Sequence, residues 1–259
     1  MQPVLATALT GMQEDMNHLD RIAQNMTNMA TPGFKREVVL SRPFADVVDS
    51  VAAAADGAVT ADVGASLHKP LILIDTSAGS LKPTGQPLDL ALSGDGFFEI
   101  STPQGLAYTR QGDFSVDAQG RLVTAAGDPV MGKSGEIRLA TRTPVIDAAG
   151  NVTEPNAPAT AAAANAGVPV AQVKVVRFAD TKAMSHLGGG LLSPGAQPEV
   201  VADATARLHQ GSLEASNTNT MQEMVQMMQT MRHFESMQKI AQGYDDLIGT
   251  AIQKLGELS

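Results

Sequence analysis

The stretch QNMTNMATPGFK, residues 24–35, decides how the chain begins. Its first half has a methionine on every helical turn and predicts the end of a helix that runs through Ala30. Thr31, Pro32 and Gly33 then break the pattern, because proline lacks an amide hydrogen and glycine favours the left-handed backbone that ends a helix. The sequence therefore predicts a methionine-rich N-terminal helix with a sharp end.

An apolar stripe with alternating spacings of four and three residues runs along this helix. Its members are Leu5, Leu9, Met12, Met16, Leu19, Ala23, Met26 and Ala30. The C-terminal part of the chain carries a similar stripe, with one register slip near Met237. Its members are Met224, Met227, Met231, Phe234, Ala241, Tyr244, Ile248, Ala251, Leu255 and Leu258. Stripes this narrow are typical of an a/d coiled-coil seam, so each end of the chain predicts a long helix with a partner helix.

The start of the second helix has several candidates. Ser216 and Asn217 are the expected N-cap, and Asn219 or Thr220 are the alternatives. The stripes can pack within one chain or between molecules, and flexible methionine side chains suit repeated partners better than a fixed core. We therefore expect self-association through the stripes, with both ends disordered in the free subunit and ordered on assembly.

Between the two helices the apolar residues alternate with a period of two. Leu88, Leu90 and Leu92 predict a half-buried strand, and a turn at residues 94–96 leads into the next strand. Glycine-ended turns are expected at residues 117–120 and 147–150, each closing a hairpin. Short strands with frequent turns predict an all-β middle domain.

The predicted fold class is α+β, with the N- and C-terminal helices forming a coiled-coil-like inner domain and an all-β domain between them. The glycine-rich residues 187–198 predict an irregular loop in the β domain. The expected domain bounds are 1–33 for the N-terminal helix, 34–80 for an extended connector, 81–205 for the β-rich outer domain and 206–259 for the C-terminal helix.

The composition narrows the function. The formal net charge of −9 argues against nucleic-acid binding, and an aromatic content of 3% without tryptophan argues against a small-molecule pocket. The absence of cysteine excludes disulfides and thiolate nucleophiles. The first basic residue is Arg21 and no apolar run reaches roughly 18 residues, so we expect neither a cleaved secretory signal nor membrane insertion.

No catalytic or metal-binding pattern is found in the sequence. The five histidines have no metal-ligand spacing, and those on the two helices are expected to face solvent. They are His18, His68, His186, His209 and His233. Nucleophile elbows and phosphate loops are also absent. We therefore expect a non-enzyme with no catalytic residue, cofactor or metal.

Three separated segments carry further information. They are AQNMTNMATPGFKR (23–36), the pair LDLALSGDGFFEI and YTRQGDFSVDAQGRLVTAAGDPVMG (88–100 and 108–132), and LEASNTNTMQEMVQMMQTMRHFE (213–235). In this order they resemble the signatures of the flagellar axial proteins, the family of rod and hook subunits. Gln24, Thr27 and Thr218 depart from the usual Asn, Ala and Val. The matching motif residues are Asn25, Asn28, Thr31, Pro32, Gly33, Phe34, Lys35, Leu213, Glu214, Ser216 and Asn217.

The resemblance implies a structural subunit of the bacterial flagellar basal-body rod. Its terminal helices would assemble into the periplasmic tube that transmits torque, after export without cleavage through the flagellar type III machinery. The implied partners are further copies and the other proximal and distal rod subunits. The proximal-rod type is the most similar, with the distal-rod type as the alternative. Two alternatives come from other functional classes. They are a secreted coiled-coil surface or adhesin-type protein and a periplasmic enzyme that uses carboxylate side chains.

Specific roles follow for the first motif. Pro32 and Gly33 are expected to set the angle between the inner and outer domains, with Phe34 turned outward to anchor the connector. Asn25 and Asn28 lie three residues apart on one helical face. They are expected either to hydrogen-bond neighbouring helices or to face water or the channel.

Overall fold

The chain divides into two compact units. The computed structural model describes residues 2–40, 71–154, 169–178, 180, 181, 183–195, 199, 200 and 207–256. Unit 1 takes its residues from Met1–Thr27, Glu37–Ile72 and Asn219–Ser259, and unit 2 from Asn28–Arg36 and Leu73–Thr218. The backbone therefore passes between the units four times.

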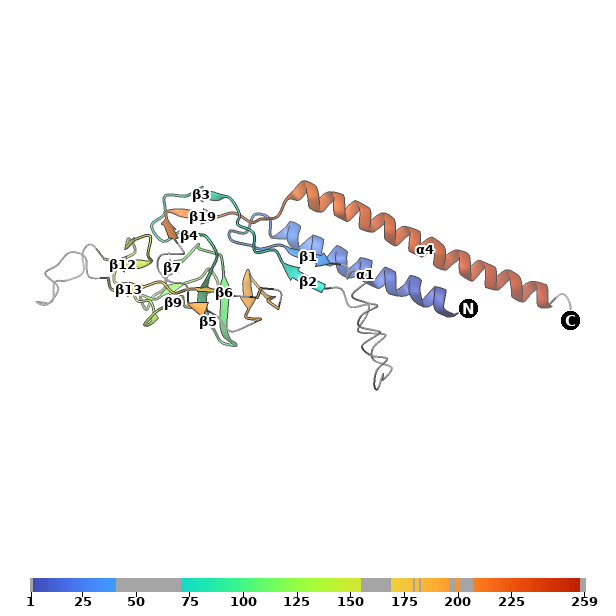
Figure 1. Ribbon diagram of the computed structural model, residues 1–259, viewed down its shortest axis with the longest axis horizontal. Helices are drawn as coiled ribbons and strands as arrows, with labels where there is room; N and C mark the ends of the chain where they lie inside the picture. Colours follow the sequence, from blue (N-terminus) through green and yellow to red (C-terminus); the bar gives the residue numbers. More distant parts are fainter. Residues whose placement is uncertain are drawn as a thin grey trace, which may run out of the picture. The chain divides into compact units, whose positions relative to one another are not determined.

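Unit 1 contains two helices, α1 (Gln2–Thr27) and α4 (Thr220–Gly256), which lie side by side (Figure 1). Strand β1 (Glu37–Leu40) pairs with β2 (Leu71–Ile74), and residues 41–70 of the expected connector lie outside the described residues. Neither helix has, in its described part, a stretch long and apolar enough to cross a bilayer.

The two helices are antiparallel. Asp15 contacts His233, His18 contacts Thr230, and Asn25 contacts Glu223, so residue numbers rise along one helix as they fall along the other. Both helices are formed and in contact within a single chain. The structure thus differs from the expectation that both ends order only on assembly.

The helix ends differ in part from the prediction. Helix α1 ends at Thr27 rather than Ala30, and the amide of Thr31 closes a turn on the carbonyl of Asn28 at 3.1 Å. Helix α4 begins at Thr220, where the side-chain oxygen of Asn219 accepts the amide hydrogen of Met221 at 3.1 Å. Asn219, the alternative, is therefore the N-cap, and the first choice of Ser216 and Asn217 was wrong.

The predicted stripes are only partly covered by the helix pairing. On α1, Met12, Leu19 and Met26 are half-buried, whereas Leu9 and Met16 are 55% and 52% exposed. On α4, the described stripe residues are partly half-buried and partly exposed. Met227, Phe234 and Tyr244 are half-buried, and Met224 and Met231 are exposed. The side chains of Leu5, Ile248 and Leu255 lie outside the described part. The buried residues of the two helices include the polar Asn25, Glu223 and Thr230 as well as the apolar Ala8 and Ile22. The seam is therefore partly polar, unlike the apolar seam of a coiled coil.

Unit 2 consists of short strands and loops, as predicted for the middle domain. In chain order the described strands are β3 (Leu81–Pro83), β4 (Leu90–Ser93), β5 (Phe97–Thr102), β6 (Gly105–Thr109), β7 (Ser115–Val116), β8 (Leu122–Val123), β9 (Met131–Gly132), β10 (Gly135–Glu136), β11 (Val145–Ile146), β12 (Asn151–Thr153), β13 (Ala171–Gln172), β14 (Val175–Arg177), β15 (Ser185–Gly188), β16 (Leu191–Ser193), β17 (Glu199–Val200), β18 (Arg207–Gln210) and β19 (Ser212–Glu214).

The largest sheet among the described strands has the order β15-β16-β6-β5-β14-β17. Smaller sheets pair β7 with β8, β9 with β10, and β11 with β12 and β13. Strands β18 and β19 pair with β4 and β3, so unit 2 extends beyond the expected boundary at residue 205. The C-terminal segment is needed there because β4 and β3 have no other strand partner among the described residues.

The two predicted hairpin turns are confirmed. Asp117 accepts the amides of Gln119 and Arg121 between β7 and β8, and Asp147 accepts those of Ala149 and Asn151 between β11 and β12. These aspartates close each turn with their own side chains.

Two other local predictions were wrong. Ala91 of β4 is fully buried, like Leu90, so this strand is buried on both faces rather than half-buried. Most of the expected loop at residues 187–198 is the β15–β16 hairpin, in which a glycine turn joins strands that belong to the main sheet. Pairing with neighbouring strands stabilises this segment in spite of the low strand propensity of glycine, and no local pattern reveals that pairing.

The main sheet separates two apolar clusters. Phe98 and Ile100 of β5 belong to one cluster, and Phe97 belongs to the other, as expected for side chains that alternate across a strand. Glu99 is also buried, and its carboxylate accepts bonds from Lys174 at 2.6 Å and from the Tyr108 hydroxyl at 3.4 Å. Burial, together with the Glu99 charge, raises the pKa of Tyr108 to about 12.

Gly112 gives a direct test of this packing. Its carbonyl accepts the amide of Leu90, and a Cβ at this position would lie 1.6 Å from the Leu90 carbonyl oxygen. We expect Gly112→Ala to lower the free energy of unfolding by about 1–3 kcal/mol or more, because two backbones must separate. Urea denaturation measures the change.

Gly243→Ala is the matched control, since no atom lies within 4 Å of a Cβ built at that helical position. This variant should be neutral or stabilised by up to about 1 kcal/mol. Equal stability of the two variants would contradict the close approach of Gly112 to β4.

Candidate functional site

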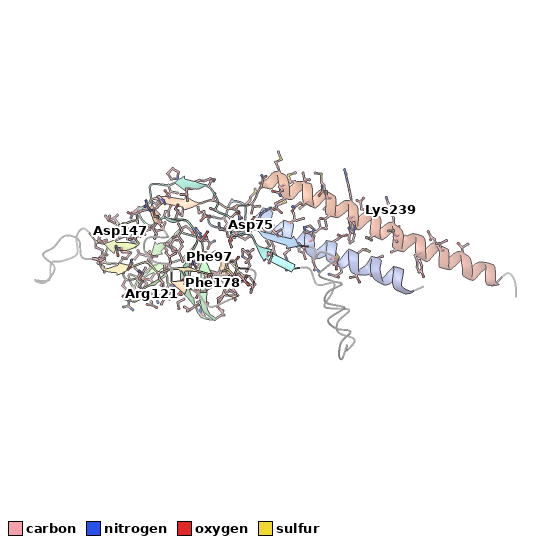
Figure 2. The ribbon with its side chains drawn as sticks, viewed as in Figure 1. Asp75, Phe97, Arg121, Asp147, Phe178 and Lys239 are labelled. Atoms are coloured by element: carbon pink, nitrogen blue, oxygen red, sulfur yellow. The ribbon has the colours of Figure 1, made fainter. Side chains whose placement is uncertain are left out.

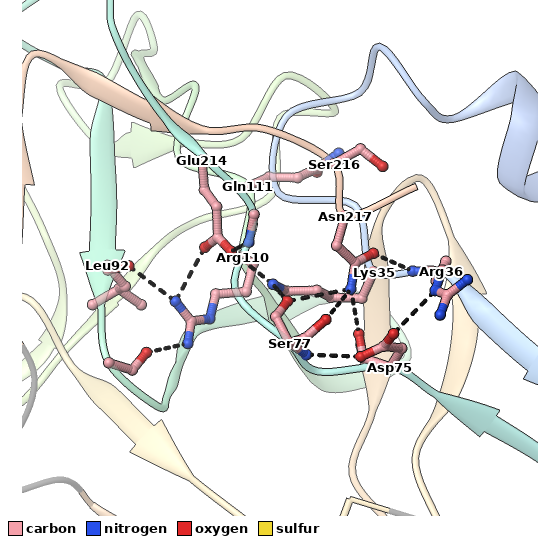
Figure 3. Close-up of polar contacts among 12 residues, drawn as sticks. Lys35, Arg36, Asp75, Ser77, Leu92, Arg110, Gln111, Glu214, Ser216 and Asn217 are labelled. Carbon is pink, nitrogen blue, oxygen red and sulfur yellow. Dashed lines mark hydrogen bonds and ion pairs between the residues drawn. The ribbon is translucent and has the colours of Figure 1, made fainter. Parts of the chain in front are cut away.

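The motif segments from the two ends of the chain meet inside unit 2 (Figure 3). The amide of Gly33 donates to the carbonyl of Glu214 at 2.7 Å, and the amide of Asn217 donates to the carbonyl of Phe34 at 3.4 Å. The amide of Arg36 donates to the side-chain oxygen of Asn217 at 2.8 Å. Residues 33–36 and 214–217 therefore lie side by side, although about 180 positions separate them in the chain.

The side chains of Lys35, Arg110 and Glu214 form what we call the buried charge cluster. The Nζ of Lys35 lies 2.6 Å from Oε1 of Glu214, and Nη1 of Arg110 lies 3.1 Å from Oε2 (Figure 3). None of the three side chains is more than 3% exposed. One carboxylate thus pairs with two cations from distant parts of the chain.

Backbone groups satisfy much of the remaining hydrogen-bonding capacity of the cluster. Lys35 Nζ donates to the carbonyl of Ser77 at 2.7 Å, and the amide of Gly79 donates to Glu214 Oε1 at 2.8 Å. Arg110 donates to the carbonyls of Leu92 and Gly94, and its guanidinium lies over the ring of Phe97. Buried ion pairs are stable only with such additional partners, because removal from water costs several kcal/mol per ion.

Burial shifts the proton equilibria of both cations. Desolvation lowers the pKa of Lys35, and the hydrogen bond and charge of Glu214 oppose that shift. Desolvation likewise lowers the pKa of Arg110, again opposed by Glu214. Glu214 is therefore the group that keeps the two buried side chains charged.

A second ion pair lies beside the cluster. Arg36 Nε lies 3.0 Å from Oδ2 of Asp75, and Asn217 Nδ2 donates to the carbonyl of Asp75 at 2.7 Å. Burial raises the pKa of Asp75, but the hydrogen bonds from Ser77 and Arg36 outweigh it and lower that pKa overall. The side chain of Asn217 is thus committed to unit 2, which explains why it does not cap α4.

Gly33 and Phe34 are both fixed in unit 2. Gly33 has a φ of 66°, and a Cβ there would lie 2.3 Å from the backbone of Arg110, so no other residue fits. Phe34 is buried and stacks on His186, whose Nε2 donates to the carbonyl of Lys35 at 2.9 Å. The expected outward turn of Phe34 was therefore wrong. The expected role of Pro32 and Gly33 in setting an angle between domains stays a prediction.

The two motif asparagines act within the chain. Asn25 is buried in unit 1, where its side chain exchanges two hydrogen bonds of 2.9 Å with the backbone of Glu37 and also donates to Glu223. Asn28 accepts a 3.3 Å bond from the hydroxyl of Thr31. Asn25 thus ties α1 to β1 and to the neighbouring helix α4. The expected hydrogen bond to a neighbouring helix is present within the chain, and the alternative, a side chain that faces water, was wrong for Asn25.

The first turns of α4 carry an exposed apolar surface, which we call the methionine face. Its members are Met221, Met224, Val225, Met228 and Met231, and each is between 46% and 76% exposed. The only charged residue between positions 219 and 231 is Glu223, which is buried against α1. The sequence stripe included Met224 and Met231 but not Met221 and Met228, because two apolar patterns overlap in this segment.

No catalytic arrangement is found in the part of the chain that the structure describes. Within it, no three His, Asp or Glu side chains come together as metal ligands. Unit 2 has a cavity of about 200 Å³ lined in part by Phe97 and Phe178, two side chains that Figure 2 labels. The other residues that line it are Thr76, Asp95, Gly96, Arg110, Arg177 and Thr181. This lining contains no histidine or lysine that pairs with a nucleophile.

Comparison with known proteins identifies the family. The domain described as "Flagellar hook protein FlgE/F/G D1 domain" matches residues 91–154, and "Flagellar basal body rod FlgEFG protein C-terminal" matches residues 209–254. The flagellar basal-body rod protein FlgF of Escherichia coli (strain K12) is 31% identical, over 98% of this chain and 99% of its own. The chain belongs to the flagellar rod and hook protein family.

Other members of the flagellar rod and hook family match to a similar extent. The rod protein FlgG of Bacillus subtilis (strain 168) is 31% identical over 94% of this chain and 96% of its own, and FlgF of Rhizobium meliloti (strain 1021) is 30% identical over 99% of both. The resemblance seen in the motifs is thereby confirmed. The C-terminal match includes Glu214 and the whole methionine face.

The sequence analysis identified only some of the residues in and beside the buried charge cluster. It singled out Lys35, Glu214 and Asn217 through the motifs, but not Arg110 or Asp75. Arg110 lies within the YTRQGDF segment, where the alternation of strand residues gives no sign that an arginine is buried. The only feature of the sequence that could have indicated its burial was the position of this arginine between a strand and a glycine.

Glu214→Gln tests the buried charge cluster. The substitution keeps the size of the side chain but leaves Lys35 and Arg110 without a counter-ion. We expect the free energy of unfolding to fall by about 3–5 kcal/mol, the cost of breaking a buried ion pair from one side. Equilibrium unfolding in urea measures it.

Glu199→Gln is the control, because Glu199 pairs with Arg177 at 3.2 Å while its side chain is 63% exposed. This exposed pair should contribute no more than about 1 kcal/mol. A loss for Glu214→Gln as small as that of the control would mean that the cluster does not hold the two motifs together.

Proposed function

We propose that the chain is a structural subunit of the flagellar basal-body rod, of the FlgF type at its proximal end. The distal rod protein is the alternative, since relatives named FlgG match equally well. In this proposal the helices of unit 1 form the inner assembly domain and unit 2 the outer one. The observation that supports it is the methionine face, which the chain's own α1 leaves uncovered.

The methionine face has the properties of a surface that is buried in an assembly. Five large apolar side chains follow one another along α4, and burial of each stabilises a contact by up to roughly 1.5–3 kcal/mol. Thioether side chains adapt to neighbours in slightly different positions, as successive subunits of a rod require. Contacts of this kind that do not close into a ring produce a helical filament.

The proposed interface also includes exposed and half-buried residues of α1. They are Leu9, Met12, Met16, Leu19 and Met26. The proposed partners are other copies and other rod subunits in the periplasmic part of the basal body, reached through the flagellar type III export machinery without a cleaved signal. The rod would transmit torque as a structural element, with no enzymatic activity and no cofactor. A surface or adhesin-type protein would not localise to the basal body.

Met231→Asp tests this interface. An aspartate placed in the methionine face carries a charge into the contact between subunits, which costs several kcal/mol when it finds no partner. We expect cells whose only copy carries this change to lose swimming in soft agar. The midpoint of urea unfolding of the purified full chain should change by no more than a surface substitution does.

Gln229→Asp is the matched control. Gln229 is exposed on α4 two residues from Met231, and therefore on nearly the opposite side of the helix. Cells with this variant should swim normally. Normal swimming with Met231→Asp, at normal protein levels, would contradict the proposed interface.

A further inference from the structure

The methionine face places four thioether sulfurs on one exposed side of α4. Between 46% and 76% of each side chain is exposed in Met221, Met224, Met228 and Met231. At 100° per residue these positions fall within an arc of roughly 80° around the helix axis. The centre of that arc lies roughly 130° from the midpoint of Glu223 and Thr230, which are buried. The four sulfurs are therefore open to small reagents in solution.

The other methionines of the chain give the comparison. Met184 is 3% exposed and belongs to an apolar cluster of unit 2. Met16 and Met29 are 52% and 48% exposed, but neither has a second exposed methionine within one helical turn. Half-buried side chains are found at Met12, Met26, Met131, Met227 and Met237. Within the described part of the chain, exposed thioethers thus cluster only at the start of α4.

Oxidation of these sulfurs would change the character of the methionine face. A thioether is apolar and flexible, whereas a sulfoxide carries a polar S=O group that accepts hydrogen bonds. The remaining member of the face, Val225, has no side-chain donor for such a group. Once buried in a contact between subunits, each S=O group would need a new partner, and burial without one is unfavourable.

We propose that the methionine face is an oxidation site at which peroxide prevents the free subunit from assembling. A sulfur lone pair attacks one oxygen of hydrogen peroxide, the O–O bond breaks, an S=O bond forms and water leaves. The sulfur is oxidised and the peroxide is reduced to water. This proposal rests on the proposed function, because the face must be buried in a subunit contact for the added oxygen to matter.

Timed peroxide treatment of the purified full chain, followed by peptide mass mapping, tests the site directly. Each of the four methionines of the face should gain one oxygen at least about tenfold faster than the buried Met184. A methionine face that reacts as slowly as Met184 would overturn the proposal.

A four-leucine variant tests whether this oxidation controls assembly. It keeps an apolar face of similar volume but has no sulfur to oxidise, and it combines Met221→Leu, Met224→Leu, Met228→Leu and Met231→Leu. Expression of the only copy is induced in cells during exposure to sublethal hydrogen peroxide, and swimming cells are counted. Peroxide should lower the swimming fraction about fivefold or more with the unchanged chain, and by less than about twofold with the four-leucine variant.

Met29→Leu is the matched control, because Met29 is 48% exposed but lies outside the methionine face. Cells with this variant should keep the full response to peroxide. Equal loss of swimming with the unchanged chain and the four-leucine variant would overturn the oxidation site and leave the assembly interface standing. Normal swimming with Met231→Asp, measured without peroxide, would instead contradict the interface itself.

The double variant Met221→Leu, Met228→Leu covers the case in which four leucines impair swimming before peroxide is added. It removes two of the four sulfurs, so the response to peroxide should fall to about half. An undiminished response in cells with this variant would also overturn the oxidation site.

Discussion

The fold of unit 2 depends on one carboxylate. Glu214, near the end of the chain, binds two cations from much earlier positions, Lys35 and Arg110, and no more than 3% of any of the three side chains is exposed. None of these charges can be buried alone, since an unpaired buried ion destabilises a protein by several kcal/mol. The first motif, the central strands and the C-terminal motif therefore depend on one another for their folded arrangement. This constraint explains why residues at both ends of the chain belong to a domain that the sequence placed between them.

The sequence could predict what local patterns determine. The helices, the α+β class and the turns at Asp117 and Asp147 follow from residue spacing and turn chemistry, and the family follows from the motifs. The parts that it missed depend on partners far along the chain. Nothing near Arg110 indicates its contact with Glu214, and nothing near residues 187–193 indicates the sheet that turns a glycine-rich segment into strands. The domain boundary at residue 205 failed for the same reason.

The helix pair shows a similar limit. Heptad spacing placed apolar residues on one side of each helix, but Asn25 and Glu223 occupy the buried seam. Asn25 finds its partners in the backbone of Glu37 in β1 and in the Glu223 carboxylate. Many of the apolar residues consequently lie at the edges and on the outer side of the helix pair. Polar residues in the seam and large apolar residues on the outside differ from the arrangement of a self-sufficient coiled coil, although Ala8 and Ile22 of α1 are also buried. A helix pair with exposed methionine side chains is better suited to contact other molecules than to remain isolated.

The four passages of the backbone between the units have a mechanical consequence. A single linker lets two domains swivel, because rotation about a few bonds changes their orientation at little energetic cost. Here the backbone connects the units at four places, residues 27–28, 36–37, 72–73 and 218–219, so a swivel must change backbone angles in four segments at once. A force on either unit is therefore carried to the other by four peptide segments rather than by one.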